Sequence, residues 1–212
     1  DEVDEDIQRS SAAWGMLTSF RTEIDAFGTQ DWITVRDRLH GFEDILSAWG
    51  EKLRGRLSDP AARWVIQEVE KYKKSLPSLK YCKGESFTTD HWSQLFKIAG
   101  VPKGEKLSTI TLNTLLSCAQ NLVDKTDELK ELAGRAQGEL TVREALVELQ
   151  TWGLETQFSL TSYSDNGCVT SIIKDWRDIM TAVGDHQSVI SSMRDSPYFG
   201  PFADEASIWE SR

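Results

Sequence analysis

The chain has 212 residues, of which 39% are hydrophobic and 27% are charged, and its formal net charge is −10. The hydrophobic fraction is sufficient for a packed core and excludes a globally disordered chain. The acidic balance argues against nucleic acid or an anionic membrane as the main partner, because both bind basic surfaces.

The cysteines indicate the redox compartment of the chain, and its ends indicate that it is part of a longer protein. Cys82, Cys118 and Cys168 are widely separated, and none forms a C-x-x-C pair. Such a set predicts no disulfide framework and favours a reducing compartment. There is no signal-peptide pattern, and no apolar run is long enough to span a bilayer. The chain begins without Met and stops within a charged helical pattern, so we expect it to be a segment of a longer protein.

The first third of the chain predicts amphipathic helices joined by short turns. In the first helix, Ile7, Trp14, Leu17 and Ile24 share one face, and Gly28 ends it. The second helix is expected over residues 31–57, with apolar residues at alternating steps of three and four. This seam consists of Trp32, Val35, Leu39, Phe42, Leu46, Trp49 and Leu53.

A third helix is expected to begin at Asp59-Pro60 and to end at Pro77. An acidic N-cap followed by proline in the first helical position is a strong start signal. Three consecutive amphipathic helices with short turns fold back on each other as a bundle.

The middle of the chain predicts a short helix and then a long one. Thr88 caps the short helix, which places Trp92 on its apolar side. The long helical stretch spans residues 111–152, with a candidate break near Ala119 and soft points at Gly134 and Gly138.

After Gly153 the hydrophobic period changes from that of a helix to that of a strand. Two β-rich runs flank Asn166-Gly167, a dipeptide that strongly favours a tight hairpin turn. With this turn, Leu160, Val169 and Ile173 share one face. A lone hairpin is marginally stable in water, so we expect this face to pack on the helices.

The chain ends in helix, aromatic turn and helix. A helix is expected from Lys174 to Met193, with Gly184 as its candidate break, and a last helix begins near Pro201. Between them, S-P-Y-F-G-P-F at residues 196–202 predicts a rigid turn. Its aromatic side chains either lie beneath the turn or form an exposed contact site.

No motif in the chain predicts catalysis. His40, His91 and His186 are far apart and do not complete a zinc site with the cysteines. The loop at residues 100–104 lacks the spacing of a phosphate-binding loop, and nucleophile-elbow and zinc-protease motifs are missing. We therefore expect no catalytic residue, metal or cofactor in this chain.

Seven short segments occur in an order that resembles the linker region of dynein heavy chains. They are D-H-W-S-Q-L at residues 90–95, R-A-Q-G-E at residues 135–139, Trp152, the hairpin at residues 158–173, D-W at residues 175–176, S-P-Y at residues 196–198 and W-E at residues 209–210. The resemblance covers residues 76–212. Residues 1–75 are less specific and look like helices leading in from the tail.

Within this family the chain is most similar to the cytoplasmic dynein 2 group. The segments that carry this similarity are L-P-S-L-K-Y at residues 76–81, R-A-Q-G-E, V-R-E-A-L at residues 142–146 and W-G at residues 152–153. Cytoplasmic dynein 1 is the near alternative, because it shares A-Q-G-E and the S-P-Y turn.

The patterns and the resemblance together predict a mainly α fold. We expect an elongated antiparallel helix bundle with one inserted β-hairpin at about residues 156–173. The expected division is a tail-side helical bundle over residues 1–76 and N-terminal linker subdomains over residues 77–212.

The resemblance implies a non-catalytic, mechanical role. In this family the linker bends when the AAA+ ring closes around ATP and straightens on product release, which drives minus-end movement along microtubules. Similarity to dynein 2 implies retrograde intraflagellar transport, in the cytoplasm and the cilium. ATP and Mg²⁺ would belong to the ring of the parent chain, which is a motor ATPase.

The implied partners are the AAA+ ring of the same heavy chain, the dynein tail and a second heavy chain. The microtubule would be reached only through the parent motor, and no nucleic acid or membrane insertion is expected. The candidate contacts are the hairpin tip and the aromatic turn, and they consist of Asp165, Asn166, Gly167, Tyr198, Phe199 and Phe202.

Two other classes of protein stay open at this point. The seam in the second helix also suits a spectrin-like helical scaffold or tether, which would usually lack a hairpin. A small helical enzyme is the second alternative, which intrinsic nucleotide binding or turnover would support.

Overall fold

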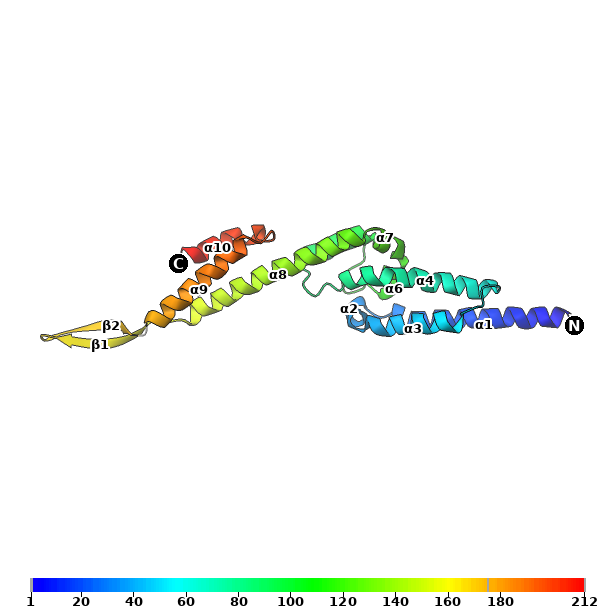
Figure 1. Cartoon of the computed structure of the whole chain (residues 1–212), viewed down its shortest axis with the longest axis horizontal. Helices are drawn as coiled ribbons and strands as arrows, with labels where there is room; N and C mark the ends of the chain where they lie inside the picture. The colour runs from blue at the N-terminus through cyan, green and yellow to red at the C-terminus, as the bar shows by residue number, and fades with distance from the viewer. Residues whose placement is uncertain (1, 175, 212) are drawn as a thin grey trace. The chain divides into compact units, whose positions relative to one another are not determined.

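The computed structural model describes residues 2–174 and 176–211 and shows helices with one β-hairpin (Figure 1). The predicted mainly α fold with an inserted hairpin is confirmed. The chain divides into two compact units, residues 1–134 and 135–212. Residue 76, where we expected the tail-side bundle to meet the linker, lies inside a helix, and that functional division stays a prediction.

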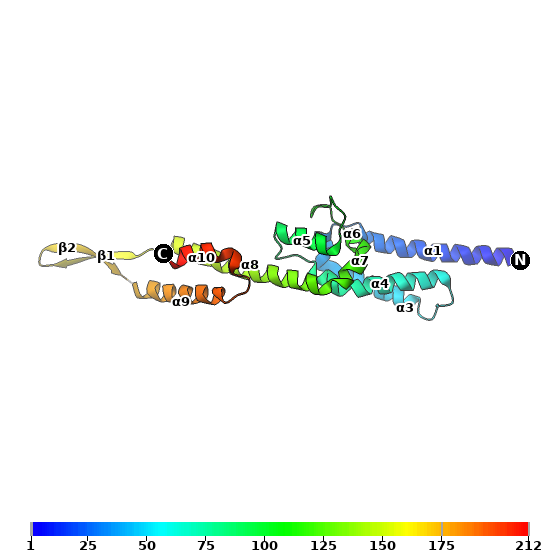
Figure 2. The same ribbon diagram turned by 90° about the horizontal axis from the view of Figure 1, so that it is seen from above.

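Three helices of the first unit lie side by side and alternate in direction. They are α1 (Glu2–Gly28), α3 (Leu39–Lys52) and α4 (Pro60–Tyr81), and each contacts the other two (Figures 1 and 2). The short α2 (Trp32–Val35) and the 3-10 helix η1 (Arg36–Arg38) join α1 to α3. The expected bundle of consecutive helices is therefore present in this unit.

The prediction of one continuous second helix is wrong, because residues 31–57 form the separate helices α2, η1 and α3. Backbone contacts tie its start to a distant segment: Trp32 N–H donates to the Ile110 carbonyl at 2.9 Å, and Asp31 forms an isolated bridge with Thr111. The chain then tightens into η1 before α3 begins, and α3 ends at Lys52. Gly55, at φ 82°, lies in the turn that follows.

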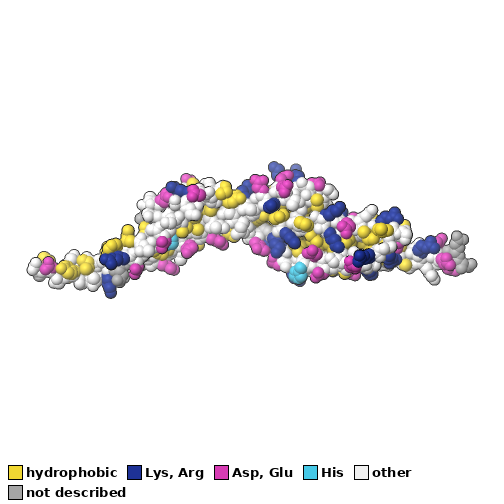
Figure 3. Space-filling model, viewed as in Figure 1, with side chains coloured by type: hydrophobic (Ala, Val, Ile, Leu, Met, Phe, Trp, Pro, Cys, Tyr) yellow, Lys and Arg dark blue, Asp and Glu magenta, His cyan; other side chains and the backbone are white. Residues whose placement is uncertain are grey.

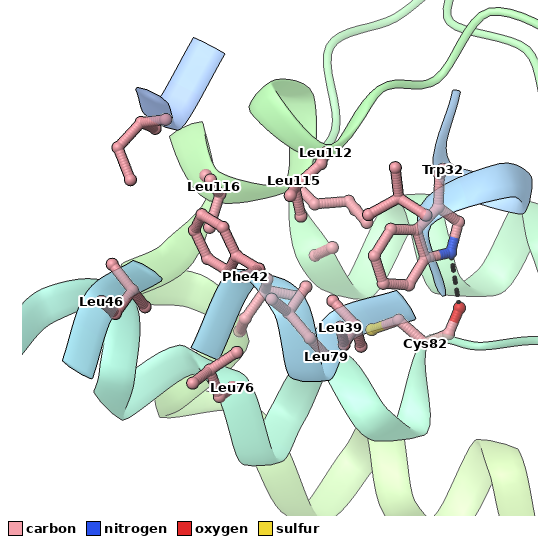
Figure 4. Close-up of a cluster of buried hydrophobic side chains, with 14 of the residues drawn as sticks. Trp32, Leu39, Phe42, Leu46, Leu76, Leu79, Cys82, Leu112, Leu115 and Leu116 are labelled. Atoms are coloured by element: carbon pink, nitrogen blue, oxygen red, sulfur yellow. Dashed lines mark hydrogen bonds between the residues drawn. The ribbon is translucent and has the colours of Figure 1, made fainter. Parts of the chain in front are cut away.

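The predicted seam is nevertheless buried along its whole length, and it forms the centre of the core. Its seven residues, Trp32, Val35, Leu39, Phe42, Leu46, Trp49 and Leu53, are at most 7% exposed. Figure 4 shows part of this core, where Trp32 Nε1–H donates to the Cys82 carbonyl at 2.9 Å. A short break in the helix thus leaves the apolar face intact.

Helix α4 begins as predicted and ends later than predicted. The Asp59 carboxylate accepts from Ala61 N–H at 2.9 Å and from Ala62 N–H at 3.3 Å. Pro77 was expected to end this helix, and that expectation is wrong, because α4 continues through it to Tyr81. Leu79, which is fully buried, gives the helix a packing reason to continue beyond the proline.

The predicted long helix over residues 111–152 is three helices. They are α6 (Leu112–Ser117), α7 (Ala119–Asp124) and α8 (Thr126–Glu155), and the short α5 (Thr89–Ala99) precedes them. The chain turns at Cys118, near the predicted break, and again at Lys125. These turns let α7 pack on α4 and bury Leu122.

The second unit consists of the later part of α8, a hairpin and two further helices. Strands β1 (Ser159–Asp165) and β2 (Cys168–Lys174) lead into α9 (Trp176–Arg194), the 3-10 helix η2 (Gly200–Phe202) and α10 (Ala203–Glu210). Helix α9 runs without a break at Gly184. Asp175, expected at the start of this helix, lies outside the described residues.

A small core of its own holds the second unit together. It draws on α8, α9 and α10, and its buried members are Val142, Leu146, Leu149, Ile190, Met193 and Ala206. Trp152 and Trp209 pack partly buried against it. The exposed segments of this unit therefore project from a defined helical base.

Candidate partner-contact site

The hairpin turn has the geometry that the sequence predicts. Asn166 and Gly167 have φ angles of 47° and 82°, and Asp165 pairs with Cys168 across the turn. Two consecutive positive φ angles are typical of a type I′ turn, whose twist matches the flanking strands. The candidate tip residues Asp165, Asn166 and Gly167 therefore lie together at the end of a regular antiparallel ladder.

The two faces of the hairpin follow from its register. Leu160 pairs with Ile173 and Ser164 with Val169, so the predicted sharing of one face by Leu160, Val169 and Ile173 is confirmed. The other face carries Tyr163. Both faces therefore present apolar side chains.

The expectation that this face packs on the helices is wrong. Leu160 is 66% exposed, Val169 74% and Ile173 46%. The hairpin extends beyond the ends of α8 and α9 in Figures 1 and 2, so no described helix of the second unit lies along it. Hydrophobic side chains are visible on its surface in Figure 3. The hairpin is thus an apolar appendage that the described residues leave uncovered.

The aromatic turn after α9 is braced against the second unit. Tyr198, Phe199 and Phe202 are each partly buried, and both phenylalanines pack on the small core. The Arg143 guanidinium lies 5.8 Å from the centre of the Phe202 ring, a cation–π distance. Within the turn, Tyr198 N–H donates to Ser196 Oγ at 3.3 Å. These contacts match the reading in which aromatic side chains lie beneath a rigid turn.

The two candidate contacts do not form one site. The hairpin precedes α9 and the aromatic turn follows it, so they lie at opposite ends of a 19-residue helix. Such a helix is about 28 Å long at 1.5 Å per residue. A single small partner group would not touch both.

A cavity lies between α8, α9 and α10, and the sequence does not predict it. Its volume is about 360 Å³, and Trp152, Phe158, Ile179, Val183, His186 and Trp209 are among its lining residues. The Trp152 and His186 rings are 4.5 Å apart. The two tryptophans and the apolar residues of α9 can be recognised in the sequence. Whether they surround a cavity depends on how the three helices pack.

Other kinds of site find little support in the described structure. Among residues 2–174 and 176–211, no three His, Cys, Asp or Glu side chains come together as a metal site. In the same described residues, no helix is both long and apolar enough to cross a bilayer. The buried Cys82 thiol has its pKa raised to about 12 by burial, so it is not an activated nucleophile.

Comparison with known proteins places this fold in a family. The chain matches "Dynein heavy chain, N-terminal region 2" over residues 1–212. It is 40% identical over 210 residues to the cytoplasmic dynein 2 heavy chain 1 of Mus musculus, which covers 98% of this chain. Identity to the Caenorhabditis elegans protein of the same name is 35% over 214 residues and 100% of this chain.

The chain also matches a more distant dynein heavy chain, and it covers a small share of the length of each relative. The cytoplasmic dynein heavy chain of Drosophila melanogaster is 27% identical over 210 residues, 98% of this chain and 4% of its own length. The chain spans about 5% of the length of the dynein 2 relatives. The similarity to dynein 2 predicted from the sequence is confirmed, and the chain belongs to the dynein heavy chain family.

Proposed function

We propose that this chain is a non-catalytic mechanical element, the linker or lever of a dynein motor that bends and straightens over the AAA+ ring. The observation that carries the proposal is similarity to dynein 2 heavy chains along the whole chain, at 35% to 40% identity in mouse and worm. Nucleotide binding and hydrolysis, with ATP and Mg²⁺, then belong to other parts of the parent heavy chain.

The proposed partners are the AAA+ ring of the same heavy chain, the dynein tail and a second heavy chain. The microtubule is reached through the parent motor. For the parent motor we propose minus-end movement in retrograde intraflagellar transport, and so a cytoskeletal and ciliary location, on the strength of its similarity to cytoplasmic dynein 2 heavy chains. The packed helices suit this role, because a close-packed core resists deformation and transmits strain.

The hairpin tip is the stronger of the two proposed ring contacts. Asp165 is exposed at the end of the ladder, whereas the aromatic turn is engaged with the core of its own unit. We therefore assign the tip to contact with the ring in one nucleotide state. The aromatic turn then sets the angle between α9 and α10. Any contact that it makes with the ring uses the exposed parts of its aromatic side chains.

Charge reversal at the tip tests this assignment in the motor. Asp165→Lys is expected to slow microtubule gliding while ATP hydrolysis continues. Ser159→Lys is the matched control, because Ser159 lies on the same strand and face at the hairpin base and is also exposed. Equal gliding speeds for the Asp165→Lys motor and the control would contradict a role for the tip.

The aromatic turn is tested separately. Alanine at Tyr198, Phe199 and Phe202 is expected to uncouple ATP hydrolysis from movement, and unchanged gliding speed would contradict this. The free energy of unfolding of the same variant chain shows how much of the effect comes from loss of packing. A spectrin-like scaffold is the less favoured function, because such modules are all-helical and this chain carries a hairpin.

A further inference from the structure

The outer edge of β2 lacks the features that usually protect a sheet edge. The described sheet consists of β1 and β2, so the far side of β2 has no neighbouring strand within the described residues. The segment C-V-T-S-I-I at residues 168–173 contains no charge and no proline. Natural edge strands are usually blunted by lysine, proline, a bulge or a covering element.

The register identifies the backbone groups that face outward along this edge. In a hairpin with a two-residue turn, the pair flanking the turn is hydrogen-bonded, and hydrogen-bonded pairs then alternate along the ladder. Asp165 and Cys168 flank the turn. By this alternation, the amide and carbonyl groups of Val169, Ser171 and Ile173 point away from β1.

These outward groups form a self-complementary edge. If a second β2 lies antiparallel with Ser171 opposite Ser171, then Val169 of each copy lies opposite Ile173 of the other. All three facing pairs are hydrogen-bonded pairs, which gives about six backbone hydrogen bonds. The outer edge of β1 is less suited to this pairing, because the same construction sets Leu160 opposite Ser164.

The charges of the hairpin fit the same arrangement. Asp165 and Lys174 are the charged residues of the two strands, and they lie at opposite ends, at the tip and at the base. A two-fold antiparallel pairing brings the Lys174 end of one hairpin alongside the Asp165 end of the other. A parallel pairing would instead place like charges at the same end.

We propose that β2 of one chain pairs with β2 of a second copy, centred on Ser171, to form a four-stranded antiparallel sheet across a two-fold axis. An isolated two-stranded hairpin is marginally stable, and three or more strands with an apolar face overcome this limit. The pairing also joins the exposed Leu160, Val169 and Ile173 of both copies into one apolar face.

The predicted dimer is weak in solution. A single strand edge buries little area, at the low end of specific interfaces, which is typical of transient association. Two copies held in one assembly would pair more readily, because tethering raises their effective concentration. The proposal concerns contact between two chains and does not depend on the proposed linker function.

Disulfide crosslinking tests the register directly. The background chain carries Cys118→Ser and Cys168→Ser and keeps the buried Cys82. Ser171→Cys then places two Cα atoms about 5.5 Å apart across the axis, a distance that a disulfide spans. Val169→Cys is the matched control on the same edge and face, and its two copies would lie about 14 Å apart, because four residues at 3.3 Å separate them along the strands and about 5 Å separates them across the pair.

The crosslinked dimer is expected to form at least about tenfold faster with Ser171→Cys than with Val169→Cys. Equal rates, or a faster reaction for Val169→Cys, would overturn the proposed register. Crosslinking only at the level of the background chain would overturn the pairing itself.

A proline pair tests the association without a covalent bond. Ser171→Pro removes an outward N–H from the β2 edge and keeps the hydrogen bonds inside the hairpin. Ser162→Pro does the same on the β1 edge, since Ser162 pairs with Ser171. Amide NMR of each variant checks that the hairpin is retained.

The masses are compared by sedimentation equilibrium at about 0.1 mM chain, a concentration suited to weak interfaces. We expect the unmodified chain and Ser162→Pro to dimerise and Ser171→Pro to be monomeric. A monomeric unmodified chain would overturn the proposal. A dimer that both proline variants disrupt equally would also overturn the proposal. A dimer that Ser171→Pro leaves intact would overturn it as well.

Discussion

The ring of Tyr198 packs directly against Gly138 on α8, in space that a methyl group at residue 138 would occupy. This contact fastens the aromatic turn after α9 to the long helix. Gly134, one turn earlier on the same helix, has no neighbouring heavy atom within 4 Å of where its Cβ would lie. Both residues are weak points in the helical sequence, and the structure gives them different roles.

Alanine at these two glycines should change stability in opposite directions. Gly138→Ala is expected to destabilise the second unit by about 1–3 kcal/mol, because overpacking forces the ring and backbone to shift. Gly134→Ala is expected to stabilise the chain by about 0.5–1 kcal/mol through helix propensity. Urea unfolding, with amide hydrogen exchange in α9 and α10, measures both, and equal effects would contradict the contact.

The Trp32–Cys82 hydrogen bond should contribute measurably to the first unit. Trp32→Phe keeps an aromatic ring but leaves the buried Cys82 carbonyl without this donor. The loss is expected to be at least about 1–3 kcal/mol, with a further cost for the smaller ring. Trp64→Phe is a suitable control, since Trp64 is 38% exposed. Chemical denaturation should show the larger change for Trp32→Phe.

The cap at the start of α4 gives a third prediction. Asp59→Ala should lower the free energy of unfolding by about 1 kcal/mol, because two N–H groups of the first turn lose their acceptor. Ser58→Ala, at the exposed neighbouring position, should change it little. The thermal melting of both variants is the measurement, and indistinguishable melting points would argue against the cap.

Stability should fall at alkaline pH. Burial raises the pKa of Cys82 to about 12, from an ordinary value near 9. Burial and the neighbouring Glu68 raise the pKa of Tyr72 to about 12, from an ordinary value near 10. The folded state holds both protons more tightly, so their contribution is complete below pH 9 and is lost as pH rises towards 12.

The Cys82 thiol should lower the free energy of unfolding by about 1.4 kcal/mol per pH unit within its window, and the partly exposed Tyr72 hydroxyl should lower it by less, because solvent screens that group. Between pH 9 and pH 10 only Cys82 of this pair contributes, and Cys82→Ala should flatten the decline there. Urea titrations at closely spaced pH values measure the slope. An unchanged slope in Cys82→Ala would show that another group is responsible.

The elements that could be predicted are those with a strong local pattern. The buried seam from Trp32 to Leu53, the Asp59 cap and the Asn166-Gly167 turn each depend on residues close in sequence. Breaks in the helices were harder to foresee, because they arise from tertiary contacts. The bond from Trp32 to the Ile110 carbonyl holds the start of α2 against a distant segment, and packing of α7 on α4 accompanies the division of the predicted long helix.

The candidate site shows the same difference between features that depend on local sequence and features that depend on tertiary contacts. The turn residues are sufficient to locate the hairpin tip. They do not show that the hairpin lacks packing, because alternating apolar residues indicate an apolar face but not the element that covers it. The sequence left the aromatic turn open between two readings, and its contact with Gly138 requires residues sixty positions apart. The cavity beside Trp152 and Trp209 likewise depends on three helices meeting.

Binding of this chain to a dynein 2 motor ring that lacks its own linker tests the proposed function most directly. The measurement compares affinity without nucleotide and with ATP plus vanadate, for the unmodified chain, Asp165→Lys and Ser159→Lys. A linker should bind in a nucleotide-dependent way, and Asp165→Lys should weaken that binding while Ser159→Lys does not. Equal affinity in both nucleotide states, or no binding in either, would contradict the account.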